Sequence, residues 1–103
     1  MGAFIQVARS TDLAIGSAVA VEVGGRTVAV FRTAEQLFAV DDMCTHSGGP
    51  LSEGEVCGTT VVCPWHGAAF DIATGRRNDA MASRDLRCYA VRERDGAIEV
   101  EAP

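Results

Sequence analysis

The stretch that decides the fold of this chain begins Cys44-Thr45-His46, continues for sixteen residues, and ends Cys63-Pro64-Trp65-His66-Gly67. A Cys and a His two positions apart lie on the same side of an extended chain, so both side chains can reach one site. A Cys and a His three positions apart need a turn, and Pro64 presets φ for one. The pattern therefore predicts two loops, each of which offers one thiolate and one imidazole to a shared metal group.

The spacing of these four side chains separates two kinds of metal site. Two thiolates and two imidazoles suit either zinc or an iron–sulfur cluster. Zinc sites more often combine Cys-x₂₋₄-Cys with His-x₃₋₅-His, whereas the order here is Cys-x-His and Cys-x₂-His. In a Rieske centre, two His ligands replace two Cys ligands on one of the two irons. The spacing favours the iron–sulfur interpretation, and a structural zinc-binding interaction module is the alternative of another class.

Outside this stretch, short apolar runs alternate with glycines. These runs predict strands at Phe4–Ala8, Ala18–Val23, Thr27–Phe31, Gln36–Val40, Thr59–Cys63, Ala68–Ile72, Leu86–Arg94 and Ala97–Glu101. Gly24-Gly25 and Asp95-Gly96 each predict a tight hairpin. Only Ser10–Ala14 has the features of a short turn with a capping residue. Many short strands joined by glycine turns predict an all-β sandwich or barrel.

Length and charge limit the possible functions. A chain of 103 residues fits a single domain, 1–103, and its 48 % apolar and 22 % charged residues are typical of a globular protein. Its apolar runs are too short to span a membrane and no secretory signal is visible, so we expect a soluble cytoplasmic protein. The net charge of −5 argues against a nucleic-acid partner and allows a protein partner with a basic face.

Two further cysteines lack a ligand spacing. We expect Cys57 to be a small apolar filler near the metal loops. Cys88 lies where Leu86, Cys88 and Ala90 alternate with more polar neighbours, which predicts a half-buried strand with a buried Cys88. A disulfide between the two would be unusual in a reducing cytosol.

The two segments resemble the ligand boxes of Rieske [2Fe–2S] proteins, and the flanking runs 49–54 and 70–75 are typical of them. The resemblance covers the chain from about Phe38 to Val100. It implies a Rieske-like antiparallel β sandwich with a small cluster-binding subdomain made of two loops, about residues 41–72. It also implies one [2Fe–2S] cluster per chain, with the ligands Cys44, His46, Cys63 and His66.

Within that family, the sequence is most similar to the ferredoxins of bacterial ring-hydroxylating oxygenase systems. The resemblance implies a monomeric one-electron carrier between a flavin-dependent ferredoxin reductase and a terminal Rieske oxygenase, with docking near His46, His66 and Trp65. A small subunit of assimilatory nitrite reductase is the second possibility. A complete oxygenase would need a further iron, usually held by two His and a carboxylate, but the chain has only two histidines. The chain is therefore expected to be no enzyme by itself.

Comparison within the family also predicts a low reduction potential. High-potential members carry an extra Cys in each box, joined by a disulfide, where this chain has Gly49 and Trp65. They also carry a Ser and a Tyr that donate hydrogen bonds to sulfur, where this chain has Ala68 and Phe70. Hydrogen bonds to the sulfurs stabilise the reduced state, so their absence lowers the potential.

The surroundings of the two boxes suggest how a partner would dock. By resemblance, the imidazole Nε2 atoms point outward, and an apolar tip of Gly48, Gly49, Pro50 and Trp65 surrounds them. Charged residues flank the tip: Asp41, Asp42, Glu53 and Glu55. A solvated face is the usual role of such charges, and an acidic rim that steers a basic partner is the functional alternative.

Overall fold

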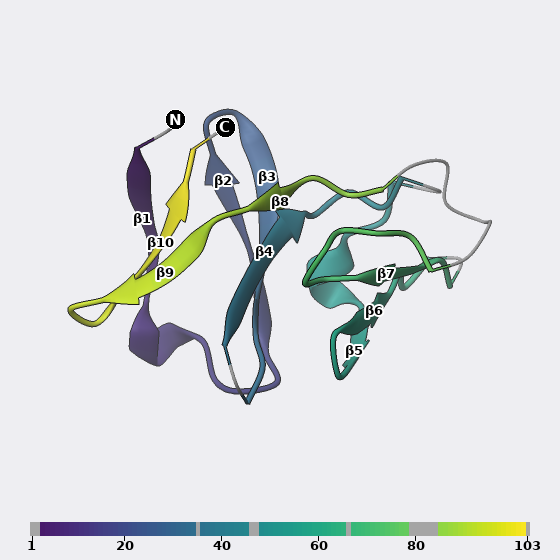
Figure 1. The fold of residues 1–103 in the computed structure, drawn as a ribbon, viewed down its shortest axis with the longest axis horizontal. Helices are drawn as coiled ribbons and strands as arrows, with labels where there is room; N and C mark the ends of the chain where they lie inside the picture. The colour runs from purple at the N-terminus through teal and green to yellow at the C-terminus, as the bar shows by residue number, and fades with distance from the viewer. Residues whose placement is uncertain (1–2, 35, 46–47, 66, 79–84, 103) are drawn as a thin grey trace.

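The computed structural model describes residues 3–34, 36–45, 48–65, 67–78 and 85–102 and consists of three antiparallel sheets (Figure 1). In chain order the elements are β1 (Phe4–Arg9), η1 (Ser10–Asp12), β2 (Ala18–Val23), β3 (Arg26–Arg32), β4 (Leu37–Asp41), η2 (Leu51–Glu53), β5 (Glu55–Cys57), β6 (Thr60–Val62), β7 (Ala69–Asp71), β8 (Cys88–Tyr89), β9 (Val91–Arg94) and β10 (Ala97–Glu101). The sheets have the strand orders β1-β10-β9, β2-β3-β4-β8 and β5-β6-β7. The predicted all-β antiparallel fold is confirmed. No helix of the described residues is long and apolar enough to cross a membrane.

The four-stranded sheet is the middle layer, and its strand β3 is buried on both faces. Val28 and Val30 pack in one apolar core with Ile98 and Val100 of β10. Because successive side chains of a strand point to opposite faces, the intervening residues of β3 face the other way. A strand buried on both faces needs a continuous apolar run, which explains the uninterrupted stretch from Val28 to Phe31.

The opposite face of the middle sheet carries the small sheet β5-β6-β7. Ala29 and Phe31 of β3 belong to a second core, which also contains Val61 of β6 and Phe70 of β7. Figure 1 shows this small sheet at one end of the molecule, on the far side of the middle sheet from β1, β9 and β10. The segment with the two Cys/His boxes is thus packed against the sandwich.

Both predicted hairpin turns are present. Gly24 and Gly25 have φ of 58° and 81°, and they join β2 to β3. Asp95 and Gly96 have φ of 52° and 78°, and they join β9 to β10. Two consecutive residues with positive φ match the twist of the flanking strands, which is why Gly-Gly and Asp-Gly favour this turn.

The strand predicted over Leu86–Arg94 is in fact two strands in different sheets. Tyr89 in β8 pairs with Ala39 of β4 in the middle sheet, whereas β9 pairs with β10 in the outer sheet. Between them, the carbonyl of Ala90 accepts a hydrogen bond from the Glu101 amide at 2.9 Å. The chain changes sheets at Ala90, so no single face is buried throughout: Leu86 and Tyr89 are buried and Cys88 is exposed.

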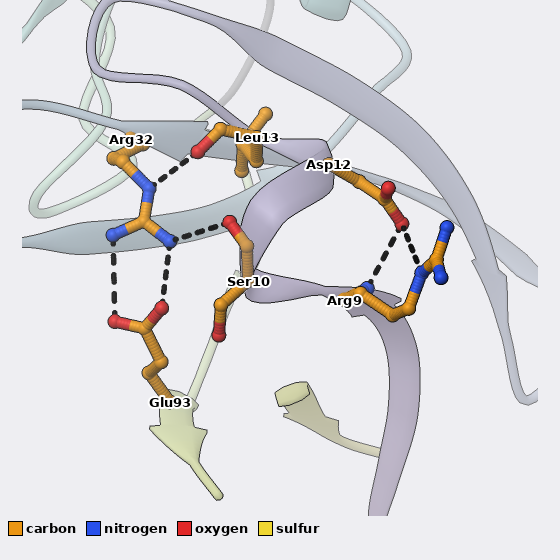
Figure 2. Close-up of polar contacts among 6 residues, drawn as sticks. All are labelled: Arg9, Ser10, Asp12, Leu13, Arg32 and Glu93. Carbon is orange, nitrogen blue, oxygen red and sulfur yellow. Dashed lines mark hydrogen bonds and ion pairs between the residues drawn. The ribbon is translucent and has the colours of Figure 1, made fainter. Parts of the chain in front are cut away.

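One arginine, Arg32, connects three segments of the sandwich (Figure 2). Arg32 donates from Nε to the Leu13 carbonyl at 2.6 Å, and from Nη2 to Glu93 Oε2 at 2.8 Å. These bonds link β3 to the turn after β1 and to β9. The hydrogen bonds from Arg32 lower the pKa of Glu93.

Candidate metal centre

The first box lies in a loop that leaves β4, residues 42–52, hereafter the first loop. The Cys44 amide donates to the Gly49 carbonyl at 2.9 Å, and the Gly48 amide donates to the Cys44 carbonyl at 2.8 Å. Met43 and Pro50, which flank Cys44 and Gly49 in the sequence, form an antiparallel bridge. Gly48 has a φ of 79°, a conformation that L-residues with a side chain rarely adopt. Residues 42–45 and 48–52 therefore run antiparallel to each other, held by the bonds from Cys44 to Gly48 and Gly49.

The second box lies between β6 and β7, in residues 62–69, hereafter the second loop. The Cys63 amide donates to the Ala68 carbonyl at 2.8 Å, and the Gly67 amide donates to the Cys63 carbonyl at 3.1 Å. Gly67 has a φ of 82°. The loop continues the hairpin of β6 and β7, in which Val62 pairs with Ala69.

The two loops repeat one backbone design. In each, the amide of the Cys bonds the carbonyl five residues later, and its carbonyl receives the amide four residues later. The glycine at the fourth position has nearly the same positive φ in both. The signal for this likeness was present in the sequence as Cys-x₃-Gly in both boxes, although the prediction of two loops did not use it.

Both thiols point into apolar surroundings. Cys44 and Cys63 are 1 % and 2 % exposed and belong to the same core as Phe31. A β-carbon built on Gly49 would lie 2.9 Å from Cys63 Sγ and 2.9 Å from Trp65 Cγ. The first loop therefore lies directly against the second, and the two predicted cysteine ligands are brought to one region.

The two histidines of the prediction, His46 and His66, lie outside the described residues. No group of three or more His, Cys, Asp or Glu side chains gathers among the residues that are described. Ala68 and Phe70, the positions at which we expect a hydroxyl to raise the potential, are fully buried in the core that holds both cysteines. The core around the two thiols is thus apolar where Ala68 and Phe70 contribute to it.

The predictions for the other two cysteines are wrong. Cys57 lies in β5 and Cys88 in β8, and both are exposed thiols without a disulfide. Cys57 is no apolar filler because β5 is a short strand at the edge of the small sheet, where alternate side chains point to solvent. Cys88 is exposed as a residue, although a β-carbon built on Gly75 would lie 2.9 Å from its Sγ.

The acidic residues beside the first loop have two different roles. Glu53 and Glu55 are exposed, as a solvated rim requires. Asp42 is only 7 % exposed, and its Oδ1 accepts a hydrogen bond from the Ser52 amide at 2.7 Å. Its backbone carbonyl also accepts from the Leu51 amide at 2.7 Å. The expectation of a solvated Asp42 is wrong, because this carboxylate closes the base of the first loop.

A second acidic residue is held by groups that the sequence did not single out. Tyr89 donates its hydroxyl proton to Asp41 Oδ1 at 2.6 Å, and Arg26 lies 3.6 Å from Asp41 Oδ2. The Asp41 amide also donates to the Arg87 carbonyl at 2.9 Å. Burial, followed by the hydrogen bond to Asp41, raises the pKa of Tyr89. These contacts join the end of β4, from which the chain runs to the small sheet, to β8, at which it returns.

The donor chemistry fits an iron–sulfur group. Two buried thiols on matching loops are soft ligands for iron or zinc, and thiolates together with imidazoles are the ligand types of a Rieske cluster. Over residues 3–90 the sequence matches the profile of the Rieske [2Fe–2S] domain. This chain belongs to the Rieske family. The Rieske domain carries a [2Fe–2S] cluster, as predicted.

Relatives of this Rieske domain include carriers of similar length. It is 33 % identical over 98 residues to ferredoxin CarAc of Metapseudomonas resinovorans. The aligned region covers 94 % of this chain and 92 % of the relative. The structure of the ferredoxin of carbazole 1,9a-dioxygenase from Nocardioides aromaticivorans IC177 superimposes with a TM-score of 0.91 at 26 % identity, over 97 % of this chain and 98 % of that one.

Two further solved structures bear on the partner. The ferredoxin in a complex of reduced oxygenase and oxidized ferredoxin of carbazole 1,9a-dioxygenase matches with a TM-score of 0.87 and 32 % identity, over 95 % of this chain and 92 % of that one. A protein described as a putative nitrite reductase small subunit matches with a TM-score of 0.84 at 20 % identity, over 97 % and 99 %. The second likeness is one of fold alone.

Proposed function

We propose that this chain is the ferredoxin component of a ring-hydroxylating dioxygenase system and carries single electrons to a terminal oxygenase. The observation that carries the proposal is the match to ferredoxins over nearly the whole of both chains. A carrier needs a cluster and a docking surface. The chain has only two histidines, too few to hold a second, mononuclear iron as well.

The proposed ligands are Cys44 and His46 from the first loop and Cys63 and His66 from the second. The matching backbone of the two loops supports this set, because it presents the two thiols in equivalent ways. When bound, the cluster supplies reversible one-electron chemistry. The protein's part is to exclude water from the thiols, which are 1 % and 2 % exposed.

The proposed docking face surrounds the two loops. Trp65 is 58 % exposed and Met43 is 65 % exposed, and each lies within two residues of a ligand cysteine. Large exposed apolar side chains of this kind mark interaction sites, and a small interface suits brief docking. Exposed Glu53 and Glu55 complete an acidic rim for basic partners, which we take to be the oxygenase and a flavin-dependent reductase.

We place this carrier in the cytoplasm as a monomer built as one domain, with a cluster-binding subdomain over about 41–72. Disulfides are rare in a reducing compartment, and we expect the exposed Cys57 and Cys88 to stay reduced there. Sedimentation of the holoprotein would test the monomer, and a stable dimer would contradict it.

The test of the function has two parts. Iron, zinc and acid-labile sulfide are measured on protein from cells supplied with both metals, and we expect two irons and two sulfides per chain. Then the dithionite-reduced protein is mixed with an oxidised ring-hydroxylating oxygenase, and the electron transfer is followed by absorbance. Stoichiometric zinc without iron would overturn the proposal and favour the zinc module instead. Transfer to a nitrite reductase large subunit but to no oxygenase would favour the nitrite reductase role.

A further inference from the structure

Position 49 has no room for a side chain. A β-carbon at Gly49 would lie 2.9 Å from Cys63 Sγ, 2.9 Å from Trp65 Cγ and 3.0 Å from Trp65 Cδ2. Real β-carbons essentially never approach other atoms so closely. Since both atoms lie 2.9 Å from the same point, the thiol sulfur and the indole ring are no more than twice that distance apart. The backbone of the first loop and the indole of the second thus meet beside a proposed cluster ligand.

Backbone conformation does not explain the glycine at this position. Gly48 needs its φ of 79°, but Gly49 is not among the glycines with positive φ. The equivalent position of the second loop is Ala68, which receives the same hydrogen bond from the Cys amide and is fully buried. The shared loop design therefore accepts a methyl group. At position 49 the neighbouring indole and thiol exclude it.

Trp65 is an unusual neighbour for a buried thiol. The indole is 58 % exposed, whereas Gly49 is buried and Cys63 is only 2 % exposed. One side of the ring therefore covers the glycine and lies near the sulfur, while the rest faces solvent. An aromatic ring in this position excludes water from what it covers, without being part of the core.

We propose that Gly49 and Trp65 form a shielding pair, in which the missing side chain at position 49 lets the indole lie over the Cys63 side of the cluster and keep water away from it. The inference rests on the proposed ligand role of Cys63. Reduction adds one electron and therefore one negative charge to the cluster, and water stabilises that added charge. Solvent exposure is one of the factors that set the potential of iron–sulfur clusters. The shield therefore lowers the reduction potential and slows the loss of iron to chelators.

The experiment compares holoprotein variants by voltammetry, by the spectrum of the reduced cluster and by the rate at which a strong chelator removes iron. Trp65→Ala should raise the potential and speed iron removal several-fold, and Trp65→Phe should restore most of both. Gly49→Ala should shift both in the same direction as Trp65→Ala. Because Trp65 is the only tryptophan, acrylamide quenching of its fluorescence should also increase in Gly49→Ala. Ile15→Ala is the matched control, since it removes an exposed apolar side chain that belongs to neither loop.

The double variant decides whether the two residues act as a pair. If Gly49→Ala acts by displacing the indole, Gly49→Ala/Trp65→Ala should match Trp65→Ala alone. If the effects of the two single substitutions on the potential and on iron removal add up in the double variant, the two residues do not act as a pair, because the methyl group then acts on Cys63 directly. An unchanged potential and chelation rate in Trp65→Ala, with the wild-type cluster intact, would overturn the shield and leave the proposed function standing. If Gly49→Ala assembles no cluster, the Trp65 series and its control decide the shield. A wild type that holds no iron would instead contradict the proposed function.

Discussion

At the scale of single residues, the most direct test concerns the sulfur environment. Ala68 and Phe70 are fully buried in the core that contains Cys44 and Cys63. Ala68→Ser with Phe70→Tyr would bring two hydroxyl donors into that region. We expect the reduction potential to rise from the low end of a range that spans roughly −150 to +300 mV for Rieske centres. Voltammetry at neutral pH measures it, with Phe70→Leu as a control that adds no donor. An unchanged potential would mean that neither hydroxyl reaches a sulfur.

Cys88 offers a second residue-scale prediction. Its thiol is exposed, yet partial burial, with the Asp71 and Asp41 carboxylates, raises its pKa. The thiolate is the reactive form, so we expect Cys88 to be alkylated several-fold more slowly than glutathione at mildly alkaline pH. The measurement uses holoprotein with Cys57→Ser and mass spectrometry of the product. Asp71→Asn should speed the reaction, and a rate equal to that of glutathione would contradict the pKa shift.

At the scale of elements, the contact between β8 and the end of β4 is testable through pH. Burial and the hydrogen bond to Asp41 raise the folded-state pKa of Tyr89 above its unfolded value of about 10. The stability that this bond contributes is therefore fully present below about pH 10 and is lost as the pH rises through the folded pKa. Tyr89→Phe should cost about 1–2 kcal/mol near neutral pH, the range of a buried hydrogen bond.

Above pH 10, the free energy of unfolding of wild type should fall more steeply than that of Tyr89→Phe. Denaturant titrations at several pH values measure both slopes. Tyr89 is the only tyrosine, so ultraviolet absorbance follows its ionisation alone, with Tyr89→Phe as the blank. Parallel slopes in the two proteins would show that the hydroxyl does not carry this linkage.

Elements whose signals are local were predictable from the sequence. Gly24-Gly25 requires positive φ and marks a hairpin, and β2 was predicted with its observed ends, Ala18 and Val23. The strand break at Ala90 was not predictable from local signals, because it depends on the pairing of β8 with β4, which is distant along the chain, while β9 pairs with β10. Burial of Asp42 likewise depends on its partner, the Ser52 amide, which only the folded loop brings near. The spacing alone singled out Cys44 and Cys63, which the structure brings into one core, and their role as ligands stays a prediction.

At the scale of the whole molecule, charge should govern how the carrier meets its partner. Glu53 is exposed beside the first loop, whereas Asp41 is engaged by Tyr89 and Arg26. Glu53→Lys should therefore slow association with a basic partner and weaken its salt dependence, without changing the potential. Stopped-flow reduction kinetics over a series of salt concentrations measure this, with Glu22→Lys on β2 as a control of equal charge change. Identical effects of both substitutions would mean that only net charge matters.

The pairing of the first strand with the last has a consequence for how the chain folds. β1 lies beside β10 (Figure 1), and in their register Phe4 pairs with Glu101. The β2–β3–β4 and β5–β6–β7 meanders need only contacts between neighbours in the sequence. The pairing of β1 with β10 in the outer sheet, by contrast, must bring together residues that are almost the length of the chain apart. Such distant contacts form late and slowly. On the ribosome, both loops that carry the cysteines leave the exit tunnel before β10 does. The region proposed to hold the cluster can therefore take shape while the sandwich beneath it is still open on one side.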